Sequence, residues 1–232
     1  MAARVDDRLV RHPRILVSCL LLTSSWLLVP TATAGPPTDD GRGDPDVTAA
    51  AYDWLDADTP NDTYAITLVR GRSVRSVLRM LEPRRELGSM TPSDAYGFYL
   101  DRLDMQTYTG PHVTQVHARG PGVVIVDLSG FPDDRRLARL SRRGTVSSFF
   151  TTVELDTYVT VARQGRIIRR FDTGFRPPRN GALPEERGLG FGQKGVDPFA
   201  PAWALNERLT LIHVSEDWFF GEHPTYVLPG RG

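Results

Sequence analysis

The stretch from Thr145 to Asp172, TVSSFFTTVELDTYVTVARQGRIIRRFD, most constrains the fold of this 232-residue chain. From Phe149 onward, aromatic and β-branched residues alternate with a period of two, which is typical of a β-strand. Two further alternating runs, 158–163 and 166–171, flank Gln164-Gly165. Because glycine accepts a positive φ at no steric cost, these two residues predict a tight hairpin turn. Residues 145–172 thus predict a meander of three strands. The helices expected before and after it then have a sheet to pack against.

The hairpin also predicts a register. With a two-residue loop, Arg163 faces Arg166, a like-charge pair that is tolerable only at a solvated tip. The other expected partners across the hairpin are Ala162 with Ile167, Val161 with Ile168, and Tyr158 with Phe171. The last pair predicts two aromatic side chains in contact across neighbouring strands.

Residues 1–34 have the features of an export signal. A basic start with four arginines precedes an apolar run over 15–30, and Ala32-Thr33-Ala34 supplies the small residues that a signal peptidase reads. Sixteen residues are short for a membrane span, which needs roughly 20. We therefore expect a secreted, cleaved chain, with an uncleaved N-terminal membrane anchor or lipidation at Cys19 as the alternatives.

Composition excludes several classes of chemistry. Cys19 is the only cysteine, so removal of residues 1–34 leaves a chain without a disulfide, a thiol nucleophile or a cysteine metal ligand. Basic and acidic residues balance at 28 each, so no strong field favours nucleic acid or a membrane surface. We expect no nucleic-acid partner, and membrane contact only through an uncleaved signal.

The remaining chain divides into three parts. Residues 35–47 are rich in proline, glycine and aspartate and predict a disordered linker. Residues 48–220 predict the folded domain, and residues 221–232 predict an irregular tail. Within the domain, Gly174 to Gly195 holds six glycines and three prolines without apolar periodicity, so it predicts a long loop.

Strands and helices alternate irregularly through 48–220. Tyr64 to Val69 is apolar on both sides, as in a buried strand, and Val123 to Leu128 predicts a central strand. Ser73 is placed to cap a helix whose apolar stripe runs through Val74, Val77, Leu78 and Leu81. The predicted fold is a single α+β domain, with an antiparallel or mixed sheet of five to seven strands and helices mostly on one face.

Two groups of basic residues are candidate binding sites for an anionic ligand. The first lies on the long loop, because arginines suit carboxylates and phosphates and loops carry much recognition. Its members are Arg176, Arg179, Arg187 and Lys194. The alternative lies on the helix after Ser73 and comprises Arg72, Arg75 and Arg79.

No well-known catalytic, cofactor or metal motif is present. His112 and His117 lie five apart on a predicted strand and point to opposite faces, so they do not form a metal-binding pair. The glycine-rich run 188–195 lacks the Gly-Lys-Ser/Thr of a phosphate-binding loop, and neither His-Glu-x-x-His nor Gly-x-Ser-x-Gly occurs. We assign no catalytic residue, cofactor or metal. An enzyme remains an alternative if Asp127, His117 and the loop arginines meet in one cleft.

Several segments resemble a family of actinobacterial domains of unknown function, DUF6461. They span about residues 48–218 and are Trp54-Leu55 before YAITLVRG, then SVRSVLRML, VVIVDL, Leu140-Ser-x-x-Gly144, VARQGRIIRRFD and ALNERLT. The chain departs from the family in its export signal and in the loop that replaces a Trp-Gly-x-x-Pro segment. The resemblance implies an α+β domain and brings no activity. We expect an exported module that binds a protein or a small anionic ligand. The alternatives are an enzyme with a site near 174–195 and an immunity-like inhibitor of a toxin.

Overall fold

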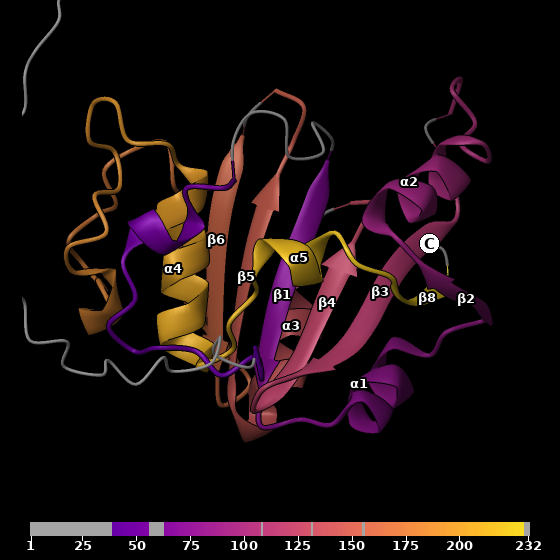
Figure 1. The fold of residues 1–232 in the computed structure, drawn as a ribbon, viewed down its shortest axis with the longest axis horizontal. Coiled ribbons are helices and arrows are strands. Elements are labelled where there is room, and N and C mark those ends of the chain that lie inside the picture. The colour runs from indigo at the N-terminus through magenta and orange to yellow at the C-terminus, as the bar shows by residue number, and fades with distance from the viewer. Residues whose placement is uncertain (1–38, 56–62, 108, 131, 155, 230–232) are drawn as a thin grey trace, which may run out of the picture. The chain divides into compact units, whose positions relative to one another are not determined.

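The fold is built around one eight-stranded antiparallel sheet (Figure 1). The computed structural model describes residues 39–229 apart from 56–62, 108, 131 and 155. Along the sheet the strand order is β2-β8-β3-β4-β1-β5-β6-β7. The strands are β1 (Tyr64–Arg70), β2 (Arg85–Met90), β3 (His112–Arg119), β4 (Gly122–Asp127), β5 (Thr145–Thr151), β6 (Thr157–Arg163), β7 (Arg166–Asp172) and β8 (His223–Leu228).

Helices cover both faces of the sheet. The α-helices are α1 (Val74–Leu81), α2 (Pro92–Leu100), α3 (Asp134–Leu140), α4 (Phe199–Thr210) and α5 (Glu216–Phe219). The short 3₁₀ helices are η1 (Ala49–Tyr52), η2 (Ser141–Arg143) and η3 (Pro184–Glu186). Figure 1 shows α4 and α5 in front of the sheet and α3 behind it.

Two apolar clusters, one on each face, hold these layers together. On what we call the α4 face, Trp203, Leu205 and Phe219 pack against alternate residues of the central strands. On the α3 face, Val77 and Leu137 pack against the other set. Because successive side chains of a strand point to opposite faces, the apolar run of β1 supplies both clusters. The α+β single-domain class is confirmed; α2, α4 and α5 contribute to the cluster on the α4 face, and α1 and α3 contribute to the cluster on the other face.

The sheet has one strand more than the predicted maximum of seven, because two strands have weak sequence signals. In β2, RELGSM is largely exposed and is interrupted at Gly88, whose φ is 90°. In β8, Pro224 falls inside the strand, and proline usually argues against a central position. The pairing of β8 with β3 runs only from Leu228 to Thr225, so Pro224 lies beyond that ladder. Residues 223–228 thus correct the prediction of an irregular tail.

The segment 39–47 is also not a disordered linker. Gly43 N donates to Leu211 O over 2.9 Å, and His213 N donates to Gly41 O over 2.9 Å. Val47 is buried in the α4-face cluster. Backbone hydrogen bonds form without any apolar periodicity in the sequence. The proline- and glycine-rich composition of this segment therefore did not reveal that it is ordered.

The hairpin of β6 and β7 has the predicted turn but only part of the predicted register. Arg163 faces Arg166 and Ala162 faces Ile167, as expected. A bulge then shifts the pairing, so that Val161 faces Arg169 and the predicted contact of Tyr158 with Phe171 is replaced by Tyr158 with Asp172 and Val159 with Phe171. The bulge leaves Ile168 39% exposed and places Arg169 on the α4 face, where it reaches Glu186 of η3.

The predicted export signal, residues 1–34, lies outside the described residues. Of the helices in the described part of the chain, none combines the length and the apolar character that a membrane crossing requires.

Candidate functional site

Arginine side chains from three separate segments surround two adjoining hollows at one end of the sheet. Four arginines line the first hollow, which has a volume of about 1040 Å³. Five line the second, of about 450 Å³, and two are common to both. We call this surface the arginine basin; it comprises Arg72 and Arg79 beside and on α1, Arg139, Arg142 and Arg143 of α3 and η2, and Arg163 and Arg166 at the tip of the β6–β7 hairpin.

Two glycines bring the first two segments together. A Cβ on Gly144 would lie 2.1 Å from Arg70 O, and one on Gly71 would lie 3.1 Å from Arg143 O. Such close approach of two backbones is open to glycine alone. Gly71 also has a φ of 76°, which other residues rarely adopt. The end of β1 therefore lies directly against the residues that lead into β5, and Arg72 is brought next to η2.

Hydrogen bonds fix the basin in this arrangement. Ser141 Oγ accepts from Gly165 N over 3.0 Å, which ties the hairpin tip to η2. Arg72 donates from Nε to Leu140 O over 3.1 Å and from Nη2 to Arg139 O over 3.3 Å. These carbonyls lie at the C-terminal end of α3, where a positive charge is favourable for the helix dipole. Each of these contacts joins a side chain to a backbone group of another segment, so the three arginine-bearing segments are tied to one another.

The basin is strongly positive. Among the described residues, no carboxylate lines either hollow. Burial, with the nearby charges of Arg143 and Arg142, lowers the pKa of Arg72. At the rim, Arg163 pairs with Glu185 over 2.8 Å. Crowded like charges repel one another, so an anion in the hollows would relieve that repulsion.

The predicted loop site has a different character. Arg176, Arg179, Arg187 and Lys194 are all exposed on the long loop, and none of them lines either hollow of the basin. The loop itself is held down by Arg169, which is buried and makes a two-pronged pair with Glu186, both distances being 2.8 Å. Arg169 also donates to Asn180 O and Pro178 O over 2.9 Å. The long loop is therefore a folded segment fixed to β7.

Of the alternative predicted site, the structure brings two residues into the basin. Arg72 and Arg79 line its second hollow, whereas Arg75 lines a neighbouring one together with Arg79. The sequence pattern predicted no site role for Arg142, Arg143 or the hairpin arginines. The available signal was the density of arginine in 139–143 and 163–170, but nothing in the pattern indicated that these segments meet.

The residues expected in an enzyme cleft do not converge. Asp127 is buried and its Oδ2 lies 2.5 Å from Nε2 of His112, with Ser129 N donating to Oδ1 over 3.2 Å. His117 lies on the opposite face, with its ring centroid 5.6 Å from that of Trp218 and 5.3 Å from that of His223. Within the described residues, no group of three or more potential ligands is placed to hold a metal ion.

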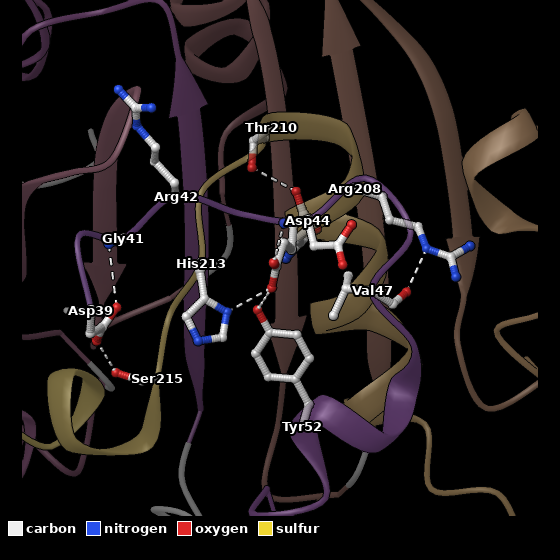
Figure 2. A network of polar contacts seen from close by, with 12 residues as sticks. Asp39, Gly41, Arg42, Asp44, Val47, Tyr52, Arg208, Thr210, His213 and Ser215 are labelled. Atoms are coloured by element: carbon white, nitrogen blue, oxygen red, sulfur yellow. Dashed lines mark hydrogen bonds and ion pairs between the residues drawn. The ribbon is translucent and has the colours of Figure 1, made fainter. Parts of the chain in front are cut away.

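A second polar cluster surrounds the buried carboxylate of Glu207 on α4. Its Oε2 accepts from Tyr52 Oη over 2.5 Å and lies 2.9 Å from Nδ1 of His213. Its Oε1 accepts from Asp44 N over 2.7 Å. Figure 2 shows the side chains of Tyr52 and His213 directed toward one another, with the backbone of Asp44 above them. This carboxylate joins η1, the segment 39–47 and the chain after α4, and no sequence motif indicated it.

The environment of this cluster shifts three pKa values. The hydrogen bond to Glu207 raises the pKa of His213, although burial opposes the shift. Burial and the Glu207 carboxylate raise the pKa of Tyr52 well above its ordinary value, so its hydroxyl remains a donor. Nearby, a hydrogen bond from Arg119 lowers the pKa of Asp39 to about 2, and Ser215 Oγ donates to the same carboxylate over 2.5 Å. The Glu207 carboxylate has hydrogen-bond partners on both oxygens, which indicates that the cluster stabilises the fold and is not an open binding site.

Comparison with known proteins concerns the whole domain and not a single site. No curated protein and no solved structure matches the chain. A family model, described as a family of unknown function, matches residues 45–226, which include every strand up to Tyr226 of β8. The match spans most of the 232 residues, so this chain belongs to the DUF6461 family.

Proposed function

We propose that this domain binds a ligand with several negative groups, through the arginine basin. The observation that supports the proposal is the gathering of arginines from three segments around two joined hollows, without a lining carboxylate among the described residues. Positive side chains spread over a surface are usually neutralised by nearby acids. Their concentration in a concave site raises the local concentration of an anion.

Arginine suits this role because of its shape. The planar guanidinium donates two parallel hydrogen bonds to a carboxylate or a phosphate and keeps its charge at every physiological pH. Arg142 and Arg143 belong to both hollows, so a ligand with more than one anionic group can contact them while it reaches the hairpin arginines or α1. Several weak charged contacts then act together.

The proposal also includes a location outside the cytoplasm. The sequence of residues 1–34 supports export, so the anionic ligand would be met outside the cytoplasm. Mass spectrometry of culture supernatant should then detect a chain that begins at Gly35. Recovery of the protein only from the cytoplasm, with Met1 or Ala2 at its start, would contradict export and would leave the binding site unaffected.

An NMR titration with sodium tripolyphosphate tests the binding site. Amide signals of 142–145 and 163–166 should shift with added ligand, because these backbone segments form the walls of the first hollow. Shifts confined to 176–194 would instead assign binding to the long loop. Absence of any shift at low ionic strength would overturn the proposal, since screening is weakest there.

A further inference from the structure

A third hollow continues the arginine basin along α1, and its walls are mainly apolar. Its volume is about 560 Å³, and it shares Arg79 with the second hollow. Val74, Leu78 and Pro83 form its apolar walls. The only carboxylate that lines it among the described residues belongs to Glu82. The three hollows are therefore connected by shared arginines, and they change from charged to apolar along their length.

The position of α1 explains the apolar wall. Val77 and Leu81 point into the α3-face core and are 0% and 4% exposed. Val74 and Leu78 belong to the same apolar stripe, but they are only half-buried at the margin of that core. One side of the stripe is thus left facing the third hollow.

The arginine basin and the adjoining apolar wall together fit some classes of anionic ligand better than others. A bare polyphosphate would use the arginines but leave the apolar wall in contact with water. Single-stranded nucleic acid gains much of its affinity from bases stacked on aromatic rings, and no aromatic side chain among the described residues lines the three hollows. A membrane surface is flat and would leave the hollows unfilled.

We infer that the ligand is an acidic segment of another protein that also carries apolar side chains. Its carboxylates lie against the arginine basin, and its apolar side chains lie against Val74 and Leu78. The inference rests on the proposed function of the basin and adds the class of partner. Charge complementarity provides the attraction, and the apolar contact provides selection among acidic chains.

Two synthetic peptides of equal length and charge test the inference with the full chain. In one, glutamates are interspersed with leucine, and in the other with glycine. The leucine peptide should bind about tenfold more tightly or better, since burial of even one leucine side chain has an effect of that size. Fluorescence anisotropy of labelled peptides measures both dissociation constants at the same ionic strength.

Variants then locate the apolar contact. Leu78→Ser should remove most of the advantage of the leucine peptide and leave the glycine peptide unchanged. Val74→Ser provides a second variant with a smaller loss of core packing, so an unfolded Leu78→Ser protein would not end the test. Leu100→Ser is the matched control, because Leu100 is 45% exposed on α2 and lines none of the three hollows.

Each outcome has a definite meaning. A leucine advantage that is lost in the α1 variants and kept in the Leu100 control supports the inference. Equal binding of the two peptides overturns it. Binding of tripolyphosphate without binding of either peptide also overturns it, while the proposed function stands. If none of the three probes binds at low ionic strength, both the inference and the proposed function fail.

Discussion

At the scale of single residues, Gly144 positions the arginine basin more directly than any arginine does. Its Cα faces Arg70 O so closely that a methyl group would have to displace the backbone of β1. Its φ of −179° is ordinary extended backbone, so the constraint is space and not conformation. The basin therefore depends on a residue without a side chain, which lies between the arginines it brings together.

Replacement of Gly144 by alanine should destabilise the domain by about 1–3 kcal/mol, the usual cost of forcing an extra group into a filled space. Gly97→Ala is the matched control, because a Cβ there meets nothing within 4 Å inside α2. The control should be neutral or stabilising by up to ~1 kcal/mol. Urea unfolding of both variants measures the difference, and equal stability of the two would contradict the close approach of Gly144 to Arg70 O.

The pH dependence of stability should reveal the contact between His213 and Glu207. The pKa of His213 is raised in the folded protein, so its contribution is fully present below the ordinary histidine pKa of about 6.5. It is lost as pH rises through the raised value. The groups that face the ring are Glu207 of α4, Tyr52 of η1, and Asp39 with Arg119.

The difference in unfolding free energy between wild type and His213→Gln isolates this contribution. It should be larger at pH 5.5 than at pH 9. His223 has a lowered pKa and so contributes the opposite dependence, but it is present in both proteins and cancels in the difference. A difference that is constant with pH, or that grows toward alkaline pH, would show that the imidazolium does not stabilise the fold through Glu207.

At the scale of elements, the β7 bulge and the long loop form one unit. The bulge places Arg169 beneath the loop, where its guanidinium accounts for four hydrogen bonds to Glu186, Asn180 and Pro178. Arg169 is 6% exposed. Removal of one partner of a buried pair leaves the other charge uncompensated, which costs about 3–5 kcal/mol. The long loop is thereby coupled to the register of the hairpin.

Arg169→Ala should therefore release the loop, and the adjacent Arg170→Ala provides the control. Arg170 points to the other face and contacts Asp134 and Thr160 at the exposed side. Limited proteolysis should cut Arg169→Ala between residues 174 and 187 much faster than it cuts wild type or Arg170→Ala. Equal cutting of all three proteins would mean that other contacts hold the loop.

Sequence reasoning succeeded where one element carries its own signal. The alternation of β5 and β6, the central β4 and the Ser73 cap of α1 were predictable, and Ser73 Oγ accepts from Ser76 N as expected. Prediction from the sequence failed where a distant segment of the same chain determines the local structure. Strand β8 has its hydrogen-bond partners in β2 and β3, which are distant in sequence, and the bulge in β7 accompanies the contact of Arg169 with Glu186 on the long loop.

The candidate site follows the same rule. Arg72 and Arg79 could be predicted together because they lie just before and on one helix, seven residues or about two helical turns apart. Arg142 and Arg166 could not be added to them, because their proximity depends on the order β1-β5-β6-β7 and on the close approach of Gly144 to Arg70. The sequence pattern does not show which ends of strands that are distant in the chain lie together. The prediction of a binding site on the long loop rests on its length and composition, which do not show whether its charges are held together in a cavity.

At the scale of the whole molecule, the absence of net charge conceals an uneven distribution. The chain has 28 basic and 28 acidic residues, yet the arginine basin is lined by no described carboxylate. Composition argued against a strongly charged partner because it averages over the surface. Local concentration of one sign is what steers and holds an anion. We therefore propose that anion binding depends on where the arginines lie and not on their number.

Isothermal titration calorimetry with sodium tripolyphosphate tests this claim through two double variants, Arg142→Glu with Arg143→Glu and Arg176→Glu with Arg179→Glu. Both change the net charge by the same amount, so long-range effects are matched. The basin variant should bind at least about tenfold more weakly than wild type, because even one lost charged hydrogen bond is worth ~1.5 kcal/mol. The loop variant should stay close to wild type. A loop variant that loses as much affinity as the basin variant, or more, would contradict the account.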